Sequence, residues 1–205
     1  MRGHIFTGVG RTIECYVKLR GNTASIEETF EQWVFGEYWQ RHARSLTRDV
    51  RDMLISGEYV WQEYQQTTIA DWAAPAIQYC RALEHELKRR FCDANYKTTY
   101  QLQGSGWTLG TPLNALTQRA HNPKALHNWQ QMCALALASG SDEAALINLM
   151  QRLETAQIRQ QRNTLAHGEA ISQNVAEAIR HLIIGSRNEP GVLVQLSELL
   201  QPVMP

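Results

Sequence analysis

The feature that most constrains this fold is a helical periodicity that begins at Ser25 and continues almost to the C-terminus. Apolar residues recur every three or four positions, and short polar or glycine-containing stretches separate the periodic segments. Ser25 and Glu28 have the spacing of a capping box, which favours a helix start there. We predict an all-α fold with helices over residues 26–40, 42–55, 58–66, 72–92, 112–120, 124–138, 142–167 and 175–185, and a short segment at 191–200.

The punctuation between these segments sets the predicted boundaries. We place a break at Gly57, a long loop over residues 95–111, and further ends at Pro123, the SGSD run, Gly168 and Pro190. Gly168 follows the last residue of the predicted helix 142–167, where a left-handed glycine commonly ends a helix.

The N-terminal segment differs from the rest. Residues 12–19 alternate between apolar and polar side chains, which predicts a half-buried strand. Residues 4–6 could pair with it across the Gly8/Gly10 turn; otherwise the strand belongs to a larger polypeptide. We therefore divide the chain into an extension, residues 1–70, in which a strand and then helices pack on the core, and a helical bundle, residues 71–205.

Composition excludes several classes of protein. A chain of 205 residues with 43% hydrophobic content can bury one substantial core, and balanced charges leave no overall field to attract nucleic acid or an anionic membrane. Any RNA-binding surface must then be a local patch. No segment has the length and apolarity of a membrane span or a signal peptide, so we expect no membrane partner.

The four cysteines are scattered and predict neither a disulfide framework nor a zinc site. Cys15, Cys80, Cys92 and Cys133 form no C-x-x-C pair and no Cys/His cluster, which fits a reduced, cytoplasmic protein without a bound metal or other cofactor. The TGVGRT stretch lacks the lysine and glycine spacing of a Walker loop, and no G-x-S-x-G elbow is present.

The segment IRQQRNTLAHGEAIS concentrates residues that can act on a phosphodiester. Asn163 and His167 lie one helical turn apart, Arg159 lies a further turn back, and Arg162 occupies the neighbouring strip. An imidazole can transfer the proton of a ribose 2′-hydroxyl, a guanidinium can stabilise phosphoryl charge, and an amide can orient either group. A helix C-terminus also favours the protonated imidazole.

The bare R-x-x-x-x-H spacing is common by chance, but its setting resembles the HEPN family. There, an Arg, a polar residue and a His end a long helix of an up-and-down four-helix bundle; RNTLAH, residues 162–167, is similar to that motif. The stretch AIQYCRALEHELKRRF, residues 76–91, resembles the first long helix of many members, and the likeness covers residues 70–186.

The resemblance implies a metal-independent endoribonuclease that needs no cofactor. Two chains would pair so that their Arg/His sets form one composite site, in a toxin–antitoxin, phage-defence or CRISPR-associated setting. The expected products are a 2′,3′-cyclic phosphate and a 5′-hydroxyl. Toxins modified by nucleotidyltransferase partners often carry a tyrosine two residues after the histidine, and this chain has Glu169 there, which puts such modification in doubt.

Two alternatives to this nuclease remain open. In the first, the histidine and arginine are an ordinary solvated pair at a helix end, and the chain is a non-catalytic HEPN module that dimerises or docks a larger complex. In the second, the chain is a subunit that becomes active only when a partner, such as an antitoxin, arranges the dimer.

One glutamate interrupts an apolar stripe upstream. Ile77, Cys80, Leu87 and Phe91 share a helix face with Glu84. A buried carboxylate needs a cation, and Arg162 or Arg159 is the natural partner across the bundle, so we expect Glu84 to position Arg162. We expect its neighbours His85 and Glu86 to lie on the surface.

A row of arginines offers a candidate RNA track. Arg41, Arg44, Arg48 and Arg51 recur at helical spacing, with Trp33, Tyr38 and Trp39 just upstream to stack bases. Asp49 and Asp52 lie next to the row, however, and can neutralise it through helical ion pairs. We assign Trp61, Trp72, Trp107 and Trp129 to packing.

Overall fold

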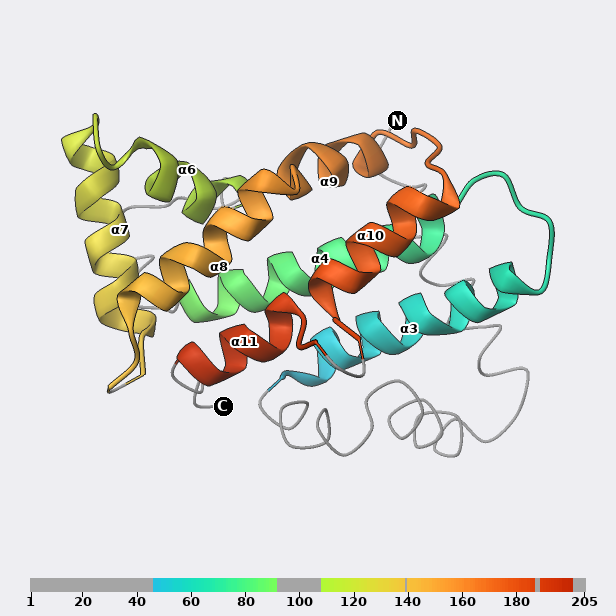
Figure 1. The fold of residues 1–205 in the computed structure, drawn as a ribbon, viewed down its shortest axis with the longest axis horizontal. Helices are drawn as coiled ribbons and strands as arrows, with labels where there is room; N and C mark the ends of the chain where they lie inside the picture. The colour runs from blue at the N-terminus through green and yellow to red at the C-terminus, as the bar shows by residue number, and fades with distance from the viewer. Residues whose placement is uncertain (1–45, 92–107, 139, 187–188, 201–205) are drawn as a thin grey trace.

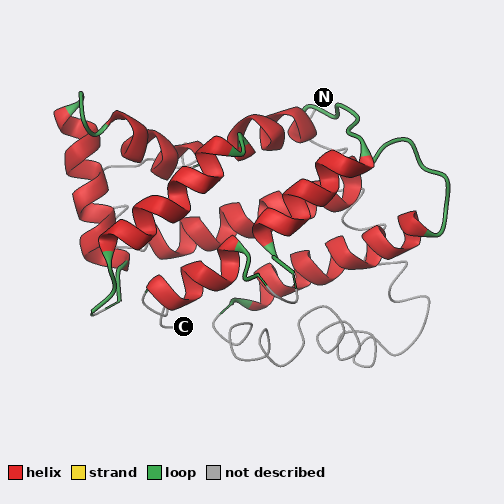
Figure 2. Cartoon of the chain, viewed as in Figure 1, coloured by secondary structure: helices red, strands yellow, loops and turns green. Residues whose placement is uncertain are grey.

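The described part of the chain is built from α-helices. A computed structural model describes residues 46–91, 108–138, 140–186 and 189–200 (Figures 1 and 2). Its helices are α3 (Arg48–Gln65), α4 (Ala73–Phe91), α6 (Gly110–Gln118), α7 (Pro123–Ala136), α8 (Glu143–Thr155), α9 (Ile158–Ala166), α10 (Gln173–Ile183) and α11 (Val192–Leu199).

These helices confirm the all-α prediction over the described ranges. The only β pairing within them consists of two isolated bridges, Leu137 with Leu200 and Gly185 with Pro190. The predicted strand 12–19 and the predicted helix 26–40 lie outside the described residues. None of the helices described is both long enough and apolar enough to cross a membrane.

Helix α4 is the centre of the assembly. It packs against α3, α10, α9 and α7, and α3, α4, the α8–α9 pair and α10 run in alternating directions (Figure 1). Helix α6 leads into α7, which crosses one end of the group (Figure 1). The apolar side chains of α4 pack on several sides because the helix is surrounded; fully buried members are Ala76, Tyr79, Cys80, Ala82, Leu83, Leu87 and Phe91.

Helix starts follow from the local sequence. Thr47, Asn122, Asp142 and Ser172 each accept a backbone N–H in the first turn of the helix that follows. Gly168, with φ of 78°, takes the left-handed conformation predicted for it after α9. The structure therefore confirms the start predicted after Asp142 and the end predicted at Gly168.

Gly57 does not break a helix, and that prediction is wrong. Helix α3 continues through it, because the glycine lets α3 and α4 approach closely. A Cβ atom at Gly57 would lie 2.8 Å from Tyr79 Cε1 and 3.2 Å from Gln78 Cβ. This glycine inside a helical pattern therefore allows close packing of two helices rather than a turn.

A buried charge network joins α3, α4 and α10 beside that contact. The Glu58 carboxylate accepts hydrogen bonds from Tyr79 Oη at 2.7 Å and from Arg180 Nη2 at 2.9 Å. Burial, followed by the charge and hydrogen bond of Glu58, holds the pKa of Tyr79 well above its usual range, so the phenol stays protonated and donates. Arg180 also lies over the ring of Trp61, 5.5 Å from its centroid.

The predicted single helix 142–167 is wrong as well, because it is split into α8 and α9. Gln157 takes the left-handed conformation, with φ of 52° and ψ of 33°, and α9 starts anew at Ile158. Nothing in the residue types at 156–157 signals this, since glutamine rarely adopts a positive φ. The two helices still run nearly end to end (Figure 1).

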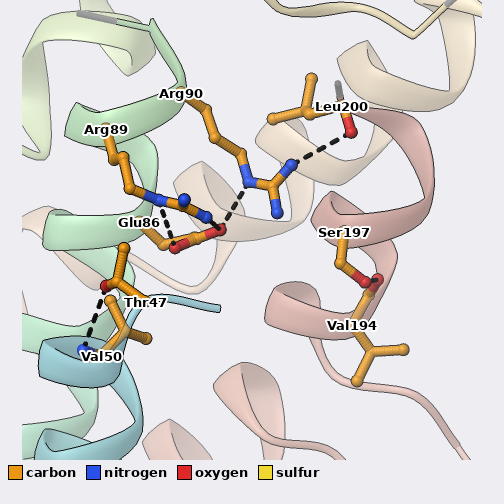
Figure 3. A network of polar contacts seen from close by, with 8 residues as sticks. All are labelled: Thr47, Val50, Glu86, Arg89, Arg90, Val194, Ser197 and Leu200. Carbon is orange, nitrogen blue, oxygen red and sulfur yellow. Dashed lines mark hydrogen bonds and ion pairs between the residues drawn. The ribbon is translucent and has the colours of Figure 1, made fainter. Parts of the chain in front are cut away.

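A second charge network ties α4 to the end of α11 (Figure 3). Glu86 is fully buried and accepts hydrogen bonds from Arg89 and Arg90, and Arg90 Nη1 donates to the carbonyl oxygen of Leu200 at 3.0 Å. The prediction that Glu86 lies on the surface is therefore wrong. His85 is exposed as predicted, because it projects from the one open strip of α4.

We predict that Gly57→Ala lowers stability by about 1–3 kcal/mol, because the new methyl group overlaps the Tyr79 ring. Replacing glycine by alanine at an open helical site would instead raise stability by about 1 kcal/mol. The sign of the measured change therefore shows whether Gly57 is in close contact with Tyr79. Urea unfolding measures the change, and Ser56→Ala on the same helix is the matched control. A stabilised Gly57→Ala protein would contradict the close contact.

We predict that two glycine substitutions near the α8–α9 junction change the unfolding free energy in opposite directions. Gln157→Gly should raise the unfolding free energy by up to about 1 kcal/mol, because it removes the cost of a left-handed non-glycine residue. Gln160→Gly inside α9 should lower it by about 1 kcal/mol. Thermal unfolding of both variants checks this, and equal losses would argue against a left-handed Gln157.

Candidate functional site

Helix α9 carries the candidate residues on a short, independently oriented segment. Only Ile158 and Leu165 are buried within it, so most of its surface is open or partly covered. Asn163 and His167 are exposed, whereas Arg162 and Arg159 are partly buried against neighbouring helices. The helix therefore presents an amide and an imidazole outward and directs two guanidinium groups along the bundle.

Arg162 is held by Glu84, as the sequence predicted. Its Nε and Nη2 atoms donate to Glu84 Oε2 at 2.9 Å and 2.8 Å, across the α4–α9 contact. The other carboxylate oxygen, Oε1, accepts the backbone N–H of Leu109 at 3.2 Å, just before α6. Each oxygen of Glu84 is thus occupied, and the side chain is only 15% exposed. The contact is confirmed; the catalytic role remains a prediction.

This pairing leaves part of the Arg162 guanidinium open. Both donors that Glu84 takes lie on one edge of the group, and Nη1 has no partner in the part of the chain that the structure describes. The side chain keeps 29% of its surface exposed. A fixed guanidinium with a free donor at the surface suits the binding of an oxyanion, because little conformational entropy is lost when the anion arrives.

Cys80 forms the apolar floor beneath the ion pair. Its thiol is fully buried, and burial raises its pKa to about 12; the nearby Arg162 charge lowers this pKa, and Glu84 opposes that effect. The thiol stays protonated at neutral pH and is no nucleophile. Its low polarity strengthens the adjacent ion pair by excluding water.

Arg159 does not join Glu84 but bridges α9 to two other helices. Its Nη1 donates to Asn114 Oδ1 on α6, and its Nη2 lies 3.3 Å from Glu154 Oε1 on α8. Gly110 makes room for the arginine stem, since a Cβ there would lie 3.0 Å from Arg159 Cδ. Of the two arginines considered for Glu84, the structure selects Arg162.

His167 closes α9 with an exposed ring. Its backbone N–H donates to the carbonyl oxygen of Asn163 at 3.0 Å, and neither side chain makes a hydrogen bond within the described ranges. No hydrogen bond or ion pair joins His167 to Arg162 there, and the two residues, five positions apart, lie on different strips of α9.

The loop after His167 is anchored at its far end. Asp71 Oδ1 accepts the backbone N–H of Ile171 at 3.2 Å and that of Ala73 at 2.9 Å, and Trp72 N–H donates to the carbonyl oxygen of Ile171 at 3.0 Å. The start of α4 thereby fixes the path that follows the imidazole.

The candidate arginine track is only partly described. Arg41 and Arg44 lie outside the described residues; Arg48 is exposed and lies 3.8 Å from Asp52, the helical ion pair expected to neutralise it. Arg51 is partly buried on α3. Trp61, Trp72 and Trp129 are buried, which confirms their assignment to packing, and Trp107 falls outside the described ranges.

The sequence reasoning missed the contribution of α6. Leu109 and Asn114 contact the two site arginines or their partners, and Glu154 pairs with Arg159, yet a backbone N–H and an isolated amide leave no pattern in a sequence. The described residues contain no group of three or more His, Cys, Asp or Glu side chains that could hold a metal ion.

Comparison of the chain with protein-family models, with curated proteins and with solved structures finds no significant match in any of the three.

We predict that Glu84→Gln lowers the unfolding free energy by about 1–3 kcal/mol, because the amide nitrogen would face donors and leave Arg162 without its counter-charge. Glu154→Gln is the matched control, since it also pairs with an arginine of α9 but is more exposed; its loss should stay within about 0.5 kcal/mol. Urea unfolding compares them. Similar losses in both variants would contradict a special role for the Glu84 pair.

Proposed function

We propose that this chain is a metal-independent endoribonuclease of the HEPN type. It cuts RNA by attack of a ribose 2′-hydroxyl on the adjacent phosphate and leaves a 2′,3′-cyclic phosphate and a 5′-hydroxyl. The observation that carries the proposal is the arrangement of Arg162: Glu84 fixes one edge of its guanidinium, and the other edge faces outward on the helix that ends at the exposed His167.

Each group has a distinct role in this chemistry. His167 moves the proton of the attacking or leaving oxygen, and its exposed ring can reach a bound strand. Arg162 stabilises the charge that develops on the phosphoryl oxygens, with Glu84 as its positioning residue. Asn163 orients the phosphate or the imidazole from the same exposed side of α9 as His167.

The separation of Arg162 and His167 supports a site made from two chains. Within one chain they occupy different strips of α9, and no hydrogen bond joins them among the described residues. A two-fold pairing of α9 with its copy would bring the Arg162 of one protomer to the His167 of its partner. The homodimer is therefore part of the proposal.

The helical arrangement fits the same proposal. Helices α3, α4, α8–α9 and α10 alternate in direction around the core, and the RNTLAH segment lies in the third of these, just before the turn to α10. We assign this group to an up-and-down HEPN bundle, which then includes α3 from the predicted extension, residues 1–70. The biological setting that follows is a cytoplasmic toxin or phage-defence nuclease, restrained by an antitoxin or by a larger complex.

His167→Ala should abolish RNA cleavage, by at least about 100-fold, because a positioned general acid or base contributes that much. Purified protein is incubated with labelled RNA in EDTA, and the products are separated on a denaturing gel. His85→Ala is the matched control, since that histidine is exposed on α4 and outside the site. Its cleavage rate should equal that of the unchanged protein.

Two results would count against the nuclease. Equal cleavage by the His167→Ala and unchanged proteins would show that another residue or a contaminant acts. No cleavage by the unchanged protein, alone or with a host extract that supplies a partner, would favour the non-catalytic interaction module.

A further inference from the structure

Helix α6 packs against α7 and α8, and its Asn114 side chain reaches Arg159 on α9. Its inward face is buried through Pro112, Leu113, Ala115 and Leu116, whereas Asn114 is exposed. The start of α6 is bound to the site twice: Leu109 N–H donates to Glu84, and Gly110 receives the stem of Arg159. The position of Asn114 is therefore coupled to the same residues that hold Arg162.

The orientation of the Asn114 amide follows from chemistry. Arginine has no acceptor, so the atom that meets Arg159 Nη1 must be the amide oxygen. The amide nitrogen then points away from Arg159, and it has no partner among the described residues. Two N–H donors are thus presented to solvent in a fixed direction, beside a guanidinium that Glu154 restrains from the other side.

Asn114 meets α9 next to the phosphate-binding arginine. Arg159, its partner, precedes Arg162 by three residues, which corresponds to about 4.5 Å along a helix. A strand whose cleaved phosphate is bound by Arg162 and that continues toward Arg159 would reach Asn114 with a neighbouring nucleotide.

We infer that Asn114, held by Arg159, reads the base of a nucleotide that adjoins the cleavage position in single-stranded RNA, and so sets the sequence preference of the enzyme. This inference rests on the proposed function. The fixed amide donors match acceptors on an unpaired base edge, such as a carbonyl oxygen or a ring nitrogen, and Arg159 supplies positive charge for the adjoining phosphate.

Binding of RNA tests this assignment without relying on cleavage. In the His167→Ala background, short fluorescent single-stranded RNAs that differ at one position are titrated by anisotropy. Asn114→Ala should weaken binding of the preferred RNA about 5- to 10-fold, as expected for one lost base contact, and should reduce the difference between RNAs. Gln118→Ala, exposed on the next turn of α6, is the control and should change neither.

Asn114→Asp separates reading of the base from support of Arg159. The carboxylate can still accept from Arg159 but has no donors, so RNA binding should fall at least as far as in Asn114→Ala while the unfolding temperature does not drop. With the catalytic histidine restored, Asn114→Ala should raise KM and redistribute the cleavage positions while kcat changes less than twofold.

Results for the two proposals can differ. Binding and cleavage patterns that are the same for Asn114→Ala and Gln118→Ala would overturn the reading of a base by Asn114 and leave the nuclease standing. RNA binding that depends on Asn114 without any cleavage would overturn the nuclease alone. A protein that binds no RNA would overturn both.

Discussion

A carboxylate buried in a helical core needs a cation beside it. Three such ion pairs organise the part of the fold that the structure describes. Glu58 binds Arg180, Glu84 binds Arg162, and Glu86 binds Arg90. The first joins α3 to α10, the second joins α4 to α9, and the third leads from α4 to the end of α11. Removing one partner of a buried pair is costly, so the register of α4 against each neighbour is tightly specified.

The three ion pairs differ in their surroundings. Tyr79 donates a further hydrogen bond to Glu58, and Arg90 is buried between Glu86 and the carbonyl oxygen of Leu200; burial lowers the pKa of Arg90, against the influence of Glu86. Arg162 and Arg180 are alike in one respect, because each is held through Nε and Nη2 and each keeps part of its side chain exposed, 29% and 26%. What distinguishes Arg162 is its place on α9, the helix that also carries Asn163 and ends at the exposed His167.

Periodicity and caps predicted the helices well because both are local. The helix predicted over residues 72–92 and the helix start predicted at 142 depended only on nearby side chains. The Glu84–Arg162 contact was also predictable, because a carboxylate on an apolar stripe must find a cation. The failures at Gly57 and Glu86 depend on what packs against the helix, namely the Tyr79 ring beside Gly57 and the end of α11, which Arg90 reaches beside Glu86. The left-handed Gln157 has no signal in its residue type.

The left-handed Gln157 interrupts the helix, so the rotation of α9 about its axis does not follow from that of α8. In an unbroken helix, each inserted or deleted residue turns everything beyond it by about 100°. Here the rotation of α9 is set by the hydrogen bonds that Arg162 and Arg159 make to Glu84 and Asn114. Helix α8 has its own cap, Asp142. A change in the length of α8 can thus be taken up at the left-handed Gln157 without turning the Arg162 guanidinium away from Glu84.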